Sequence, residues 1–218
     1  MKDNQKIKVT TNGPYLVSGN VPLSDEKIVL NKDGLPLKWE KGKKYKVNGK
    51  YSLCRCGKSK NKPFCDGSHK GFFDTETANN IPFEKQAEVI NGPELTLRDA
   101  PKFCVHAGFC DRAGGIWELT KKTDDLESKK IAIEEAGNCP SGRLVVSDKE
   151  NKEIEPTFEP SISVTEDADG VPGPFWVKGG VPIESANGGD YERRNRVTLC
   201  RCGKSRNKPF CDGSHLFS

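Results

Sequence analysis

The sequence has little apolar material and lacks any long apolar run. Hydrophobic residues fill only 33% of its 218 positions, whereas glycine and proline occur 22 and 14 times, so the apolar share lies slightly below that of typical soluble domains. No stretch approaches the roughly 18 consecutive apolar residues of a membrane-spanning helix, and the first residues contain no apolar core of a signal peptide. We therefore expect a protein without a membrane segment, in which something besides a hydrophobic core stabilises the fold.

Neither sign of charge dominates, and the common catalytic motifs are missing. The 35 basic and 31 acidic residues give a formal net charge of only +4, which is too balanced to require nucleic acid or an anionic membrane as a partner. The densest basic stretch, residues 41–46, has no aromatic side chains arranged to stack on bases and is interpreted as a solvated hairpin loop. Because a nucleophile elbow, a phosphate-binding loop and a dinucleotide fingerprint are all absent, we expect no enzymatic activity.

Cysteine, by contrast, is abundant. The chain has nine cysteines, and an odd number fits poorly with a complete set of disulfide bonds. Free thiolates persist in reducing compartments, so the sequence predicts a cytoplasmic protein whose cysteines bind metal ions or clusters.

A repeated motif marks the two ends of the chain. Residues 53–69 (LCRCGKSKNKPFCDGSH) and residues 199–215 (LCRCGKSRNKPFCDGSH) differ only where Lys60 is replaced by Arg206. The match extends upstream to a Gly-Pro strand and to an I-x-V-T strand. Each copy therefore predicts two or three short strands followed by a loop that carries cysteines. The upstream matches are residues 7–10 with 162–165 and residues 13–17 with 173–177.

The first copy is longer than the second between its Gly-Pro strand and its first cysteine. The additional residues, 30–48, contain a strong turn signal at residues 31–34. Aromatic residues at equivalent positions of the two copies, Tyr15 and Phe175 with Trp176, are predicted to lie in the core.

Each copy holds three cysteines and one histidine with the spacing C-x-C-x8-C-x3-H. Three thiolates and one imidazole suit either zinc or an iron–sulfur cluster. Zinc-binding cysteine pairs usually have two to four residues between them, whereas C-x-C places two thiolates on a short extended segment that could hold one iron of a dinuclear cluster. The candidate ligands are Cys54, Cys56, Cys65 and His69 in the first copy and Cys200, Cys202, Cys211 and His215 in the second.

Other residues of the motif have predicted structural roles. Gly57 and Gly203 allow a close approach of the backbone after the second cysteine. Asp66 and Asp212 are predicted to cap a helix whose first N–H groups point toward an anionic cluster.

The string C-x-C-x2-S-x3-P-x-C-D-G-S-H resembles the CDGSH iron–sulfur domain of the mitoNEET-type family, and the match is complete in both copies. This resemblance implies that each set of four ligands binds one [2Fe–2S] cluster below a β-rich cap. Family members with one motif per chain commonly pair as two-fold dimers. The resemblance therefore suggests a monomer in which the two repeats form an intramolecular pseudo-dimer.

The segment between the repeats, residues 81–159, has a different pattern. It predicts a strand and loop at residues 103–119 and a helix at about residues 126–137, with Ile131, Ile133 and Ala136 on its apolar stripe. A strand is expected at residues 143–147.

The last three cysteines, Cys104, Cys110 and Cys139, lie in this central segment. A ferredoxin [4Fe–4S] site has the spacing C-x2-C-x2-C, but here Ala107 occupies the middle position. Three cysteines suit a [3Fe–4S] cluster, or a [4Fe–4S] cluster whose fourth iron is held by another group. His106 is either that ligand or a hydrogen-bonding group beside the cluster, and three buried thiols without metal are the remaining alternative.

With Cys104 and Cys110 before a helix and a C-P-S-G turn at residues 139–142, the central segment resembles the divergent single-cluster ferredoxin family. We accordingly predict an α+β, mainly β chain with a CDGSH repeat at 1–75, an inserted ferredoxin-like α+β domain at 76–160 and a second CDGSH repeat at 161–218. The expected function is electron transfer or redox sensing with redox partner proteins. Storage of clusters and their transfer to apo-acceptor proteins is the alternative, and a structural zinc protein is a third.

Overall fold

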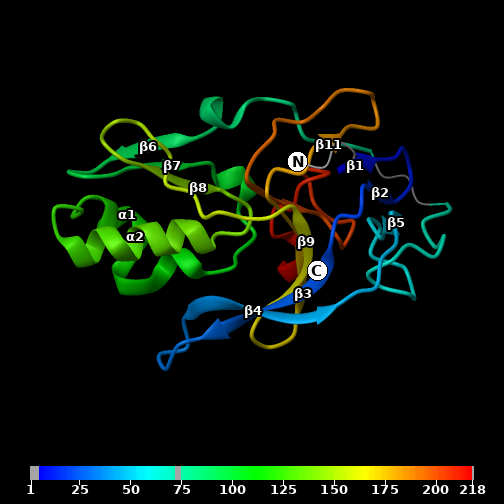
Figure 1. Ribbon diagram of the computed structural model, residues 1–218, viewed down its shortest axis with the longest axis horizontal. Coiled ribbons are helices and arrows are strands. Elements are labelled where there is room, and N and C mark those ends of the chain that lie inside the picture. The colour runs from blue at the N-terminus through cyan, green and yellow to red at the C-terminus, as the bar shows by residue number, and fades with distance from the viewer. Residues whose placement is uncertain (1–4, 72–74, 218) are drawn as a thin grey trace.

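Three β-sheets contain most of the regular structure (Figure 1). The computed structural model describes residues 5–71 and 75–217. In Figure 1 the central segment, with its helices in green, lies at the left, and the two repeats lie together at the right. The prediction of an α+β, mainly β chain is confirmed.

The two repeats form two of these sheets. The strand order of the first sheet is β11-β1-β2-β5, and that of the second is β12-β10-β9-β3-β4. In β1 and β2 buried and exposed side chains alternate, because only one face of the sheet meets the core. The strands are β1 (Lys6–Val9), β2 (Tyr15–Ser18), β3 (Leu23–Leu30), β4 (Pro36–Lys44), β5 (Lys50–Leu53), β9 (Ser161–Glu166), β10 (Pro172–Lys178), β11 (Ile183–Glu184) and β12 (Arg196–Leu199).

Each repeat contributes to the sheet of the other: the second repeat adds β11 to the first sheet, and the first repeat adds β3 and β4 to the second. Strand β1 pairs in parallel with β11, with Ile7 opposite Ile183, and β3 pairs in parallel with β9, with Leu23 opposite Ile162. Strands β1 and β9 contain the repeated I-x-V-T segments, so the two exchanges are equivalent. Neither repeat can therefore complete its sheet without the other.

Apolar side chains from both repeats form one shared core. Tyr15 and Phe175 are fully buried at equivalent positions and pack edge to face with their ring centroids 6.3 Å apart. Trp176 is only 3% exposed. The prediction that these three aromatic residues belong to the core is confirmed.

The additional residues of the first repeat, 30–48, form the turn after β3 and strand β4, which pairs with β3 as a hairpin. The side-chain oxygen of Asn31 accepts hydrogen bonds from the backbone N–H groups of Asp33 and Leu35 at 2.9 Å each, which closes the predicted turn. From β4, the ring of Trp39 packs between those of Phe109 and Trp176, at centroid distances of 5.2 and 5.1 Å. The hairpin therefore attaches the central segment to both repeats. 

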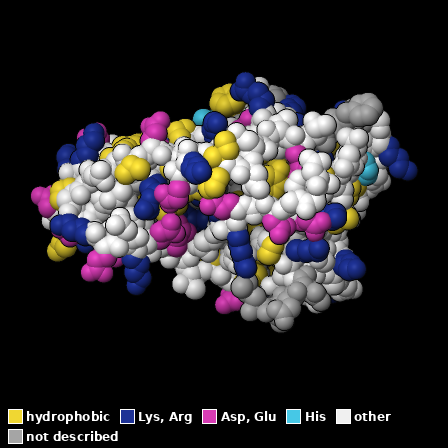
Figure 2. Space-filling model, turned by 90° about the horizontal axis from the view of Figure 1, so that it is seen from above, with side chains coloured by type: hydrophobic (Ala, Val, Ile, Leu, Met, Phe, Trp, Pro, Cys, Tyr) yellow, Lys and Arg dark blue, Asp and Glu magenta, His cyan; other side chains and the backbone are white. Residues whose placement is uncertain are grey.

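The basic stretch at residues 41–46 is exposed, as expected for a solvated segment. Its first lysines, however, belong to the outer strand β4 and not to a loop. On the face shown in Figure 2, basic and acidic side chains are interspersed, in keeping with the balanced charge of the sequence. Over the described ranges 5–71 and 75–217, no helix is both long and apolar enough to cross a membrane.

The central segment folds as a three-stranded sheet with helices. The sheet has the order β6-β7-β8 and consists of β6 (Glu88–Asn91), β7 (Thr96–Asp99) and β8 (Leu144–Ser147). Helix α2 (Leu126–Asn138) begins where the side chain of Asp125 accepts a hydrogen bond from the N–H of Ser128 at 2.8 Å. The predicted helix and the predicted strand near residue 144 are confirmed, whereas β6 and β7 were not predicted.

The strand predicted within residues 103–119 is wrong. This stretch contains the 3-10 helix η3 (Phe109–Gly114) and helix α1 (Ile116–Thr120), and the 3-10 helix η2 (Pro101–Phe103) precedes it. Ile116 and Leu119 are three residues apart, so they lie on the same face of helix α1. This face packs in one apolar cluster with the buried alanines of α2.

The apolar stripe predicted for α2 is partly wrong. The helix buries Ala132, Glu135 and Ala136, and the two isoleucines of the predicted stripe are only half-buried. Burial raises the pKa of Glu135 to about 8, although Arg112, whose Nε lies 3.8 Å from the carboxylate, opposes this shift.

This buried carboxyl group predicts a loss of stability as the pH rises. The unfolded chain releases the Glu135 proton near the ordinary pKa of 4.5, whereas the folded chain keeps it until about pH 8. Between about pH 6 and pH 8.5 this one group should therefore reduce the free energy of unfolding by about 2 kcal/mol. Chemical denaturation at both pH values should show this loss in the parent protein and not in Glu135→Gln. The exposed neighbour variant Glu134→Gln is the control, and an equal pH dependence in all three proteins would contradict the prediction.

Candidate metal centres

The first loop, residues 54–69, brings its four candidate ligands together as two pairs. The sulfur atoms of Cys54 and Cys56 are 3.8 Å apart, and the sulfur of Cys65 lies 3.3 Å from Nδ1 of His69. Each pair comes from neighbouring positions in the chain, so local backbone geometry decides the spacing within it.

The second loop, residues 200–215, has the same arrangement. Here the sulfur atoms of Cys200 and Cys202 are 3.7 Å apart, and the sulfur of Cys211 lies 3.5 Å from Nδ1 of His215. The near-identical sequences therefore fold to near-identical candidate sites.

Backbone hydrogen bonds join the two pairs within a loop. In the first loop the N–H of Cys54 donates to the carbonyl of Pro63, and the N–H of Cys65 donates to that of Ser52, each at 2.9 Å. The hydroxyl of Ser59 donates to the carbonyl of Phe64 at 2.6 Å. These bonds bring the third cysteine back beside the first.

The predicted helix cap is wrong for the first loop. The carboxylate of Asp66 accepts hydrogen bonds from the N–H groups of Lys60 and Ser68 at 2.8 and 3.0 Å, and in the described residues up to 71 no helix follows it. In the second loop, Asp212 precedes only the short 3-10 helix η4 (Ser214–Phe217). The aspartates therefore brace the loops, because their side chains satisfy N–H groups within the turn itself.

The pairwise arrangement fits a dinuclear cluster better than a single zinc ion. A structural zinc ion needs four ligands around one point, whereas each loop presents its donors as two separate pairs. A [2Fe–2S] cluster takes two ligands at each of its two irons, which agrees with the two pairs in each loop.

Burial makes two of the candidate ligand thiols costly to ionise without a metal. It raises the pKa of Cys211 to about 12, and it also raises the pKa of Cys110, in the central segment, to about 12. Bound iron would supply the positive charge that a buried thiolate needs. Burial, together with Arg201 and His106, lowers the pKa of His215 and so favours the neutral imidazole that can ligate iron.

The two loops contact one another through their glycines. A Cβ atom built on Gly57 would lie 2.5 Å from the carbonyl oxygen of Cys202, and one on Gly203 would lie 2.8 Å from that of Cys56. Both glycines also have a positive φ, 74° and 78°. The predicted close approach is thus confirmed, and its partner is the other repeat.

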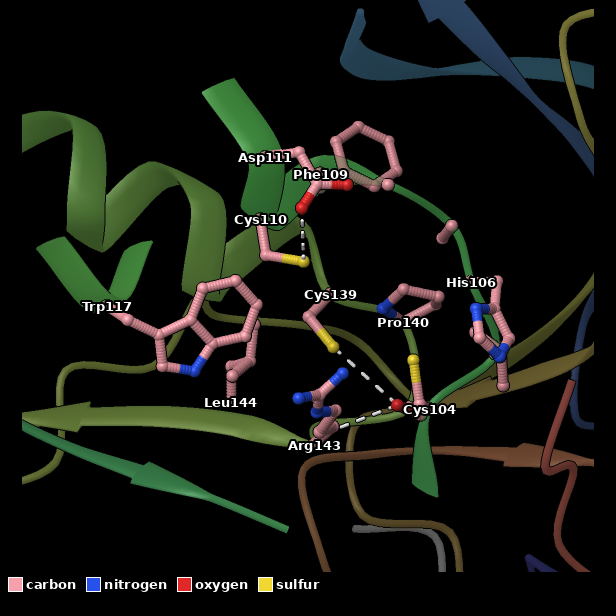
Figure 3. Close-up of a pocket in the computed structure, with 14 residues that line it drawn as sticks. Cys104, His106, Phe109, Cys110, Asp111, Trp117, Cys139, Pro140, Arg143 and Leu144 are labelled. Carbon is pink, nitrogen blue, oxygen red and sulfur yellow. Dashed lines mark hydrogen bonds between the residues drawn. The ribbon is translucent and has the colours of Figure 1, made fainter. Parts of the chain in front are cut away.

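The three remaining cysteines line a single cavity of about 240 Å³ in the central segment (Figure 3). Cys104 directly follows η2, Cys110 lies in η3, and Cys139 directly follows α2. The fold therefore brings Cys139 back to a pair that precedes it by about 30 residues in the sequence. Asp111 and Trp117 line the same cavity.

A half-buried arginine, which the sequence analysis missed, also faces this cavity. The guanidinium of Arg143 donates two hydrogen bonds to the carboxylate of Asp99, at 2.6 and 2.8 Å, and Trp117 donates a third to the same carboxylate at 2.9 Å. Burial acts to lower the pKa of Arg143, but Asp99 and Cys104 outweigh it and raise the pKa above its ordinary value. A permanent cation beside three thiols suits an anionic cluster. The position of Arg143 directly after the C-P-S-G turn is the signal that could have identified it.

The second repeat holds the turn that carries Cys139. From β12, the side chain of Arg196 donates to the carbonyls of Ala136 and Cys139, the latter at 2.6 Å, and to that of Leu144 at 3.0 Å. A salt bridge of 2.6 Å to Glu155 balances its charge. Arg196 therefore couples the end of α2 to the fold of the second repeat.

His106 lines the cavity of the three central thiols on the side of Cys104 and also faces the second loop. Its ring lies against Gly213 of the second loop and edge-on to Phe217, with a centroid distance of 5.5 Å. In Figure 3 the imidazole lies beside Cys104, away from Cys110 and Cys139. His106 therefore lies between Cys104 and the second loop.

Comparison with protein families agrees with this geometry. A family model described as an iron-binding zinc finger of CDGSH type matches residues 12–70 and 172–216, and one described as a divergent 4Fe-4S mono-cluster matches residues 90–149. Two CDGSH regions flank a divergent 4Fe-4S mono-cluster domain. The CDGSH regions imply [2Fe–2S] clusters, and the central domain implies a cluster of 4Fe-4S type. Comparison with curated proteins and with solved structures yields no significant match.

Arg143 gives a prediction for the mono-cluster domain. Replacement of Arg143 by Gln should leave the buried Asp99 without its cation and remove positive charge beside Cys104, so the central iron should be lost while the CDGSH iron is retained. Iron and sulfide per chain after gel filtration will measure this selective loss. Arg98→Gln, on the same strand as Asp99 but paired with Glu84 at 3.1 Å, is the control. Equal iron contents in both variants and the parent would contradict the role of Arg143.

Proposed function

We propose that this protein is a non-catalytic electron carrier or redox sensor with three iron–sulfur centres. Two [2Fe–2S] clusters would be held by the first and second loops, and a third cluster by the three cysteines of the central cavity. The main support for this proposal is the contact between the loops, in which Gly57 packs against the backbone of Cys202 and Gly203 against that of Cys56. Because each of these cysteines is a ligand candidate, the contact joins the two CDGSH sites through their own ligand segments.

The two repeats are proposed to work as an intramolecular pseudo-dimer. The equivalent exchanges of β3 and β11 between the sheets support this arrangement. So does the hydroxyl of Tyr15 in the first repeat, which donates to the carbonyls of Cys200 and Pro209 in the second at 2.9 and 3.0 Å. Such an arrangement keeps both sites at a constant separation without association of two chains.

The donor set limits the chemistry of each CDGSH site. A bound [2Fe–2S] cluster supplies a one-electron couple. One neutral imidazole in place of a thiolate makes the site less negative, so the potential should lie between about −400 mV for all-cysteine centres and the range of about −150 to +300 mV for two-histidine centres. The residues of this chain hold the cluster, orient the imidazole and limit the access of water.

The nuclearity of the central cluster is proposed from its ligand count. Three cysteines in the cavity support a [3Fe–4S] cluster, and the alternative is a [4Fe–4S] cluster whose fourth iron has a ligand other than cysteine. Asp111 and Arg143 also line the cavity, so both an oxygen donor and a balancing cation are available there.

Delivery of a cluster to an apo-acceptor protein is the second candidate function, and one difference between the loops favours it. Cys65 is half-buried, whereas its counterpart Cys211 is buried at 2% exposure; His69 and His215 are both half-buried. The first loop would therefore release its cluster more easily than the second. All nine cysteines are free thiols, which fits a reducing environment.

Metal and sulfide analysis with electron paramagnetic resonance on freshly isolated protein tests the proposed centres. About seven irons per chain are expected with a [3Fe–4S] central cluster and about eight with a [4Fe–4S] cluster. Reversible reduction with retention of the clusters supports electron transfer, whereas stoichiometric transfer to an apo-protein without reduction supports delivery. A colourless protein that contains zinc in place of iron would overturn the proposal.

The histidine ligands predict clusters whose potential and stability depend on pH. His69→Cys and His215→Cys should each lower the potential of the altered site, because a thiolate adds negative charge, and should make that cluster resist acid. Potentiometric titration and the decay of visible absorbance at low pH measure the two effects. Unchanged acid lability in both variants would count against these histidines as ligands.

A further inference from the structure

The mono-cluster domain touches the second loop at a contact made by His106 and Gly213. A Cβ atom built on Gly213 would lie 2.3 Å from Cδ2 of His106 and 3.2 Å from the carbonyl oxygen of Cys104. Gly213 lies between Cys211 and His215, the second ligand pair of that loop. The backbone of Cys104, a candidate ligand of the central cluster, is therefore in van der Waals contact with the segment that carries the ligands of the second CDGSH site.

A small cavity adjoins this contact. It has a volume of about 100 Å³ and is lined by His106 and Pro140 from the central domain and by His215 from the second loop. Among the described residues that line this cavity or the cavity of the three cysteines, none comes from the first loop.

Within residues 5–71 and 75–217, the first loop has no equivalent of the His106 contact. Gly67 corresponds to Gly213 in the repeat and has a similar positive φ, 88° against 81°, but no atom of the described residues lies within 4 Å of a Cβ built on it. The first loop instead contacts the second loop through Gly57 and Gly203. Near-identical loops therefore have different neighbours.

We infer from these contacts that the second CDGSH site is the middle one of the three centres. It exchanges electrons directly with the central cluster across the contact of His106 with Gly213, and with the first CDGSH site across the glycine contacts. The first site exchanges electrons with the central cluster only through the second. Each step moves one electron from a reduced cluster to an oxidised one, and no bond forms or breaks. This order rests on the proposed electron-carrier function.

Variants that each lack one CDGSH cluster test the order. Cys65→Ser should remove the first cluster and Cys211→Ser the second, and iron and sulfide analysis identifies which centres remain. After a substoichiometric pulse of reductant, freeze-quench electron paramagnetic resonance follows the redistribution of electrons between the remaining CDGSH cluster and the central cluster. We expect redistribution in Cys65→Ser at a rate independent of protein concentration, and several-fold slower redistribution in Cys211→Ser. Equal rates, or a faster rate in Cys211→Ser, would overturn the order.

A matched glycine pair tests the contact itself with all three clusters present. Gly213→Ala and Gly67→Ala place the same methyl group at a similar positive φ, but only Gly213→Ala displaces the ring of His106. Gly213→Ala should slow redistribution between the central and CDGSH clusters several-fold relative to Gly67→Ala. His106→Ala should slow it as well, whereas His106→Phe should retain the rate because it keeps an aromatic ring at this position. Equal rates in both alanine variants would contradict the role of the contact.

A redox titration of the unmodified protein separates the two ways in which this inference can fail. Clusters that do not cycle reversibly would contradict the electron-carrier function. Clusters that cycle reversibly, but exchange electrons with the central cluster equally well through either loop, would contradict only the order.

Discussion

The reciprocal parallel pairing of β1 with β11 and of β3 with β9 is the interaction on which the rest of the structure depends. A short strand with one apolar face cannot bury that face alone, and a chain with 33% hydrophobic residues has little apolar surface to spare. By exchanging strands, the two repeats share one core. The same exchange brings the two cysteine loops against each other. At the contact, Gly57 and Gly203 have a positive φ and lie so close to the backbone of the other loop that only glycine fits there.

The central domain then makes these two equivalent halves different. Arg196 from β12 holds the end of α2, and Trp39 from the hairpin of the first repeat packs on Phe109. Because these contacts place the domain beside the second loop, His106 covers Gly213, whereas none of the described residues covers Gly67 in this way. Although the two motifs are nearly identical, the second CDGSH site is thereby more buried than the first. That difference is a property of the whole chain and not of either motif.

Sequence patterns predicted the local elements better than the contacts between them. The repeated strands, the turn after Asn31 and helix α2 follow from short-range signals, namely apolar periodicity and turn chemistry. The strand expected at residues 103–119 was wrong. The short apolar stretches of this segment belong to α1 and to two 3-10 helices, and apolar side chains of α1 pack on α2. The helix cap at Asp66 was wrong because that carboxylate satisfies N–H groups inside its own turn.

The sequence by itself determined the ligand pairs of the two loops, since C-x-C and C-x3-H place their donor atoms close together by chain geometry alone. It also identified the three central cysteines, although not their surroundings. Only the tertiary structure decided that these cysteines share a cavity with Arg143, that the loops touch through their glycines, and that His106 faces the second loop. Those contacts join residues far apart in the chain, and their positions depend on how β1, β3, β9, β11 and β12 pack, which no local pattern encodes.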